Sequence, residues 1–246
     1  RRAASSWNGR SPIVPCPANW FWIRFPISGL RAPASLVTAT VLVKKAAAYH
    51  QYHAVRKAVG LAPKVSEREQ ALIEALTKRF ASADAKSDWK QFHLDYSNAM
   101  REVVRKYPDD LDAAVLFAES LMMLRPWQLW TLDGAPAAGT LELVAALESV
   151  LKRNPDHPAA NHFYIHAVEA SPNLERAIPS AMRLMTLVPG AGHLVHMPGH
   201  IYAQSDKIDE AIAAFTAAAQ NELSYLDADV LYPNGHHGHN VHFLVH

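Results

Sequence analysis

The sequence is poor in cysteine, because Cys16 is the only one among its 246 residues. An internal disulfide and a cysteine-based zinc site both need more than one thiol, so neither can form within this chain. The chain also lacks an excess of either charge, with 24 Lys and Arg against 23 Asp and Glu. This balance gives no charge-driven attraction to nucleic acid or to an anionic membrane, and we expect neither as a partner.

Long apolar runs are absent as well. No stretch of 18 or more apolar residues occurs, so we expect no membrane span. Residues 36–43 are apolar but few; they fit a degenerate signal sequence, a buried strand or the start of a helix. The single cysteine fits a reducing compartment, so we expect a soluble protein, in the cytoplasm rather than the periplasm or outside the cell.

The familiar catalytic motifs are missing too. The sequence has no His-Glu-x-x-His, no glycine-rich phosphate loop and no Gly-x-Ser-x-Gly. Residues 1–43 hold five of the 16 prolines and the aromatic run Trp20-Phe21-Trp22, and proline at that density breaks helices. We expect an irregular N-terminal segment over 1–43 and a helical repeat domain over 44–246. Because the chain stops at His246 within a helical pattern, we expect its last repeat to be truncated.

Helical signals dominate from residue 44 onward. Ser66 and Glu69 form a capping box, in which each side chain satisfies a free backbone N–H at the start of a helix. Apolar residues then recur at helical spacing, and alternating runs typical of strands are few. Pairs of like residues also lie 34 positions apart: Pro155 and Pro189, Ala177 and Ala211, His162 and His196, and His166 and His200. A period of 34 is typical of tetratricopeptide units, each a helix–turn–helix.

Residues 192–220 resemble the tetratricopeptide consensus. Gly199 takes the small position where two helices cross and Tyr202 takes the aromatic position. The pattern of the second helix is carried by Ala211, Phe215 and Ala218. The pieces HFYIHAVEASP, LVPGAGHLVHMPGHIY and HNVHFL resemble an uncharacterised group of bacterial tetratricopeptide-repeat proteins, over roughly residues 60–246. This resemblance implies an all-α array of antiparallel helix pairs, wound as a right-handed superhelix, whose common role is protein–protein interaction.

Histidine is the residue that the sequence has in excess, with ten of its 14 between His162 and His246. The resemblance implies that the first helix of each unit lines a concave groove. The groove positions of three successive units are then His162, His166 and Glu169; His193, His196 and His200; and His239, His242 and His246. Residues four apart on a helix share one face, with Cβ atoms about 5–6 Å apart, so these side chains should converge in the groove.

Neutral imidazole is a good ligand for zinc, copper and iron. We therefore predict that these eight histidines bind one or two transition-metal ions, with Glu169 as an oxygen ligand or a general base. Such a site would suit a metal-dependent hydrolase or oxidoreductase acting on a small substrate in the groove. Glu119, on an earlier first helix, is predicted to hydrogen-bond His162 or His166 from behind.

Two other interpretations stay open. The histidines can form a polar lining by hydrogen-bonding one another, Glu169 and Tyr164. Alternatively, the groove can be a metal-free scaffold that docks a peptide or a protein, with protonated imidazoles gripping acidic groups. Outside the groove, we expect His157 to be solvated and His236 and His237 to lie in a loop. Trp127 and Trp130 are expected to cap the groove as a lid or to plug the array. The sequence names neither the substrate nor the oligomeric state.

Overall fold

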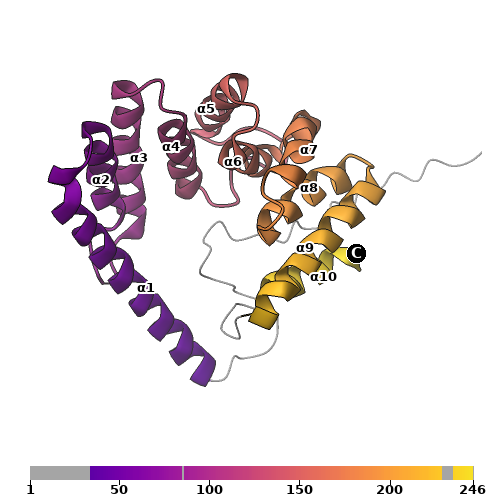
Figure 1. Ribbon diagram of the computed structural model, residues 1–246, viewed down its shortest axis with the longest axis horizontal. Helices are drawn as coiled ribbons and strands as arrows, with labels where there is room; N and C mark the ends of the chain where they lie inside the picture. Colours follow the sequence, from indigo (N-terminus) through magenta and orange to yellow (C-terminus); the bar gives the residue numbers. More distant parts are fainter. Residues whose placement is uncertain (1–33, 85, 229–234, 246) are drawn as a thin grey trace, which may run out of the picture.

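The protein is an array of helices (Figure 1). The computed structural model describes residues 34–84, 86–228 and 235–245. Within these ranges there is no β-strand, and the α-helices are α1 (Ala34–Leu61), α2 (Glu67–Arg79), α3 (Trp89–Lys106), α4 (Leu111–Leu124), α5 (Thr140–Arg153), α6 (Pro158–Val168), α7 (Ile178–Leu187), α8 (Gly192–Gln204), α9 (Ile208–Ala228) and α10 (Gly235–Leu244). Short 3₁₀ turns, η1 (Ala62–Lys64) and η2 (Leu174–Ala177), follow α1 and precede α7.

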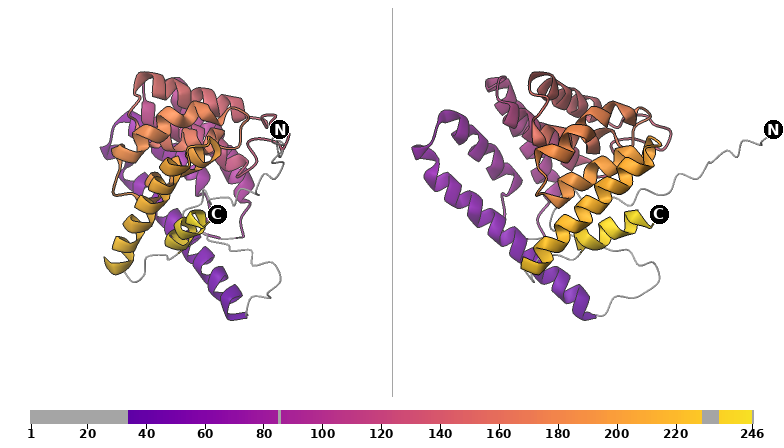
Figure 2. Two further views of the ribbon diagram at one scale, coloured as in Figure 1. Left: turned by 90° about the vertical axis from the view of Figure 1, so that its right-hand side faces the viewer. Right: turned by 45° about the vertical axis from the view of Figure 1, so that its right-hand side comes forward.

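From α2 onward the helices pack as antiparallel pairs in chain order. The pairs are α2 with α3, α4 with α5, α6 with α7 and α8 with α9, and each pair also packs on the next. First helices meet as well, since α6 contacts both α4 and α8. Helix α10 follows as a further first helix and lies alongside α9 (Figure 2). The predicted all-α, tetratricopeptide-like array of helix pairs is therefore confirmed.

Side-chain caps decide where several helices begin. Ser66 and Glu69 form the expected capping box at α2. Asp88 and Asp110 accept backbone N–H groups at the starts of α3 and α4. His157, expected to be solvated, instead caps α6: it is buried and its Nδ1 accepts the Ala160 N–H. A cap satisfies one of the free N–H groups of the first turn, so each fixes an end of a first or second helix.

The period of 34 residues is the spacing between the starts of α6 and α8. The spacing from α4 to α6 is longer because residues 125–139 are inserted between α4 and α5. This inserted loop is held by a bridge between Trp130 and Pro136 and by the Trp130 Nε1–H, which donates to the Ala167 carbonyl at 2.7 Å. The loop is therefore fixed to α6, one of the histidine-bearing helices.

Gly199 lies where α8 crosses α9, as expected. A Cβ added there would lie 2.4 Å from the nearest ring atom of Phe215. Around this contact Tyr202, Ala211 and Ala218 are all buried. The small residue thus allows α8 and α9, the first of which carries three of the histidines, to pack closely.

Two boundaries differ from the expectation. Helix α1 begins at Ala34, so the apolar residues 36–43 are helical and only residues 1–33 of the segment expected to be irregular lie outside the described residues. His236 and His237 lie in the first turn of α10 rather than in a loop. Among the described helices none is both long and apolar enough to cross a membrane.

We predict that Gly199→Ala lowers the free energy of unfolding by about 1–3 kcal/mol, because the added methyl group overpacks against Phe215. Urea denaturation measures this change. The matched control is Gly60→Ala, within α1, where an added Cβ meets nothing within 4 Å; it should be neutral or slightly stabilising. Equal effects of the two substitutions would contradict the close helix crossing.

Candidate metal centre

Six of the eight predicted histidines gather into two groups of three. The first triad is His162 and His166 from α6 with His193 from α8; the second triad is His196 and His200 from α8 with His239 from α10. In each triad one ring nitrogen per histidine can be chosen so that all three lie within 4.8 Å of one another. Each triad therefore takes two residues four apart on one helix and one residue from the next first helix.

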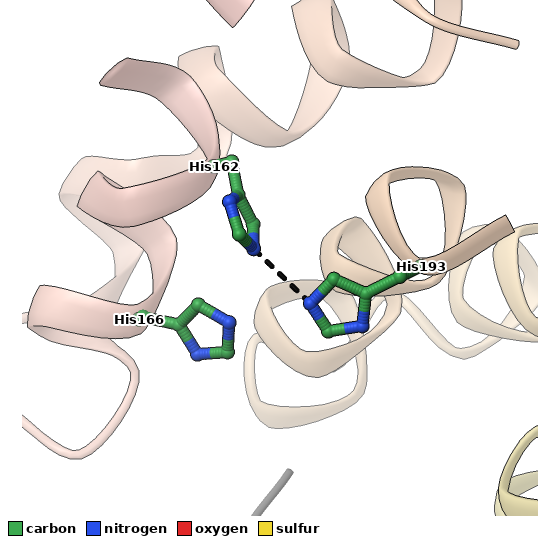
Figure 3. A group of neighbouring side chains, drawn as sticks. All are labelled: His162, His166 and His193. Atoms are coloured by element: carbon green, nitrogen blue, oxygen red, sulfur yellow. Dashed lines mark hydrogen bonds between the residues drawn. The ribbon is translucent and has the colours of Figure 1, made fainter. Parts of the chain in front are cut away.

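The rings of the first triad point toward one another across the α6–α8 contact (Figure 3). The His162 and His193 Nε2 atoms are 3.1 Å apart. The His166 ring lies 4.9 Å from that of His162 and stacks on that of His193 at 5.7 Å, measured between centroids. The His162 side chain is buried, and the His166 side chain is 7% exposed. This triad is a compact set of nitrogen donors.

The second triad is tighter. The Nε2 atoms of His196 and His200 are 2.8 Å apart, and the His239 ring lies 4.8 Å from that of His196. His196 Nδ1 is 2.6 Å from Asn240 Oδ1. An amide oxygen can only accept, so the His196 Nδ1–H donates this bond. The Nε2 of the neutral ring then carries a lone pair and no hydrogen. Asn240, itself buried, thus aims that lone pair into the triad.

Glu169 lies between the two triads. It is 5% exposed and forms the C-cap of α6. The His166 Nδ1–H donates to its Oε1 at 3.0 Å, while its Oε2 lies 3.6 Å from His200 Nδ1 and accepts no hydrogen bond among the described residues. One carboxylate therefore contacts a histidine of each triad.

Burial controls the protonation of these groups. Desolvation lowers the pKa of His162 and of His196 well below the usual 6.5, with neighbouring histidines adding to the effect. Desolvation also lowers the pKa of His200, against the opposing effect of Glu169. Burial alone would raise the pKa of Glu169, but the hydrogen bond from His166 and the nearby His166 and His200 bring it below its usual value. His162, His196 and His200 are thus held as neutral imidazoles, beside the carboxylate anion of Glu169.

Some predicted residues lie outside the triads. His242 is exposed on α10, and His246 lies outside the described residues. Glu119 was expected behind His162 or His166, and this prediction is wrong: both its carboxylate oxygens accept from the Arg79 guanidinium at 3.0 Å. The sequence reasoning missed Asn240, because an asparagine one residue after a histidine gives no spacing signal of its own.

Comparison with known proteins gives likeness in shape alone. No family model matches the chain, and no curated protein matches it in sequence. A crystal structure of MamA covers 80% of this chain and 99% of its own at 14% identity, with a TM-score of 0.49. A MamA mutant covers 74% and 93%, at 16% identity and a TM-score of 0.46.

We predict that the metal-free protein loses stability as the pH falls below about 6.5. The unfolded chain protonates its histidines there, whereas buried His162, His196 and His200 stay neutral because their pKa values are lowered. Each such histidine adds a slope of about 1.4 kcal/mol per pH unit to the free energy of unfolding. This contribution is complete above pH 6.5 and is lost as the pH falls toward the lowered pKa of the folded protein. Urea denaturation between pH 5 and 7.5 measures it. His196→Gln should reduce the slope, whereas a change at exposed His50 should not.

Proposed function

We propose that the protein binds two transition-metal ions, one in each histidine triad, as a metal-dependent hydrolase or oxidoreductase. The observation that carries this proposal is the contact of the His196 and His200 Nε2 atoms at 2.8 Å inside the second triad. Three protein ligands at each ion leave a position for water or substrate, which is typical of catalytic rather than structural sites.

Hydrogen bonds alone cannot satisfy all the ring nitrogens of the second triad. His196 Nε2 carries a lone pair, because the one hydrogen of the neutral ring is on Nδ1, which donates it to Asn240. If neutral His200 donates from Nε2 to His196, its own Nδ1 lone pair faces the Glu169 carboxylate. If it donates from Nδ1 to Glu169, two Nε2 lone pairs face each other at 2.8 Å. Either tautomer sets two acceptors together in the protein interior, which is costly.

A cation between His196 and His200 removes this conflict, since both Nε2 lone pairs can then point at it. That cation is either a proton or a metal ion. Burial lowers the pKa of His200, which disfavours the proton at neutral pH and keeps the ring neutral, the form that binds a metal ion. Two nitrogens bound to one tetrahedral zinc lie about 3.3 Å apart, given Zn–N bonds of about 2.0–2.1 Å, so the rings need only small shifts.

The ligand type favours zinc or copper over iron. Each triad offers imidazole nitrogen alone, and imidazole suits zinc and copper, whereas non-haem iron sites commonly include a carboxylate. Glu169 instead contacts the Nδ1 side of His166 and of His200. A carboxylate that accepts the Nδ1–H of a ligating histidine fixes the tautomer and makes Nε2 a better donor. We assign that positioning role to Glu169 in place of the expected metal ligand or general base.

We predict that protein purified without an affinity tag, stripped and then dialysed against zinc or copper, holds about two ions per chain by elemental analysis. His162→Ala with His166→Ala should remove one ion, and His196→Ala with His200→Ala should remove the other. The control is His50→Ala with His53→Ala, which changes two exposed histidines on α1. A wild-type protein that holds no metal, and binds a peptide or protein in a chelator-insensitive way, would favour the scaffold instead.

We further predict that Glu169→Gln lowers the metal affinity of the second triad but not that of the first. The amide oxygen can still accept from His166, so the first triad should keep nearly its full affinity. The amide NH₂ then faces His200 Nδ1 and forces the hydrogen of that ring onto Nε2, so the second triad should bind about 10–100-fold more weakly. Glu169→Ala should weaken both triads.

Isothermal titration of the stripped protein with zinc resolves the two binding events. Glu148→Gln is the matched control, since Glu148 accepts from Tyr164 of the same helix α6 and pairs with Arg176, neither of which belongs to a triad. Unchanged affinities in Glu169→Gln, or an equal loss at both triads, would rule out the positioning role.

A further inference from the structure

An aromatic side chain stands beside the first triad. The Trp127 ring lies 6.1 Å from the His166 ring in a T-shaped arrangement, although the two residues are on different elements. Trp127 belongs to the inserted loop, residues 125–139, and is 40% exposed. A large apolar ring left partly open to solvent next to buried polar residues is a usual feature of ligand-binding surfaces.

The backbone at Trp127 is strained. Its φ is 62°, in the left-handed region, where a bulky residue is a rare outlier. Strain of this kind persists only where the surroundings impose it, and it concentrates at functional sites. A glycine or asparagine would adopt this conformation more readily, so the strain is a cost of having an indole at this position.

The rest of the loop holds the indole in place. Besides the Trp130 bond to Ala167, the Arg125 Nε–H donates to the Ala138 carbonyl at 3.1 Å, and Thr140 Oγ1–H donates to the Leu129 carbonyl at 2.7 Å. These bonds lie on both sides of Trp127 and tie the loop to α6 and to the start of α5. The loop is therefore anchored on both sides of the indole.

We propose that Trp127 forms the substrate-binding wall of the first triad and selects a ligand with an aromatic ring next to its metal-binding oxygens. This inference rests on the proposed function, because it needs an ion in the first triad. The ion takes the oxygens at the position that His162, His166 and His193 leave open, and the ring of the ligand packs on the exposed indole. An aromatic pair of this kind adds specificity beyond the apolar area that it buries.

The test uses two hydroxamates that present the same metal-binding group. Benzohydroxamate carries an aromatic ring and acetohydroxamate a methyl group, and calorimetry on the zinc-loaded protein gives the affinity of each. The preference is the ratio of the affinity for benzohydroxamate to that for acetohydroxamate. We expect this ratio to be about tenfold higher in the wild type than in Trp127→Gly. Glycine suits the left-handed backbone, so this variant loses the ring without straining the loop. Trp127→Phe should keep part of the preference.

Trp89→Ala is the control, because Trp89 begins α3 and packs on Phe92, away from the triads. The zinc content of every variant is measured first. Full zinc content with the same preference in wild type and Trp127→Gly overturns the wall and leaves the metal centre standing. A wild type without zinc overturns the proposed function itself, and the wall with it.

Discussion

The negative charge of Glu169 is the constraint on which the arrangement of the histidines depends. A buried carboxylate is costly unless it is paired, and this one lies at the C-terminal end of α6, where the helix dipole disfavours an anion. Its Oε1 accepts a hydrogen bond from the His166 Nδ1–H, and its Oε2 lies 3.6 Å from His200 Nδ1. Because a neutral imidazole has a single N–H, a ring that donates its Nδ1–H to Glu169 keeps a lone pair on Nε2 for its triad. The hydrogen bond to Glu169 sets this tautomer for His166, and it would do the same for a His200 that turned its Nδ1–H toward Glu169.

The repeat explains why much of this site could be predicted from the sequence. A period of 34 residues places His162 and His166 on α6 at the same positions as His196 and His200 on α8. The grouping could not be predicted. Each helix was expected to present its own three groove residues, but His193 joins the triad of α6, and His239 joins that of α8. Such exchange depends on how adjacent first helices are offset along their axes, and residue spacing within one helix carries no information on that offset.

The inserted loop marks a second limit of prediction from the sequence. Its length and its tryptophans were evident, but the place of Trp127 depends on a left-handed backbone that its residue type disfavours. The conformation results from tertiary contacts instead. Trp130 reaches the last turn of α6, and Gly134, with φ of 83°, lies so close to Pro172 that an added Cβ would be 2.6 Å from the proline ring. Local propensity describes none of these contacts.

Position in the array, rather than the fold itself, decides the chemistry of each first helix. Glu119 is the ninth residue of α4, as His166 is of α6 and His200 of α8. Glu119 pairs with a permanently charged arginine from α2. The ring of His166 instead stacks on that of His193 from α8, and the ring of His200 lies 6.5 Å from that of His239 from α10. An ion pair is complete by itself, since each charge cancels the other. Imidazoles whose nitrogens converge offer lone pairs to a cation, so under the proposed function the same ninth position is structural in α4 and binds metal in α6 and α8.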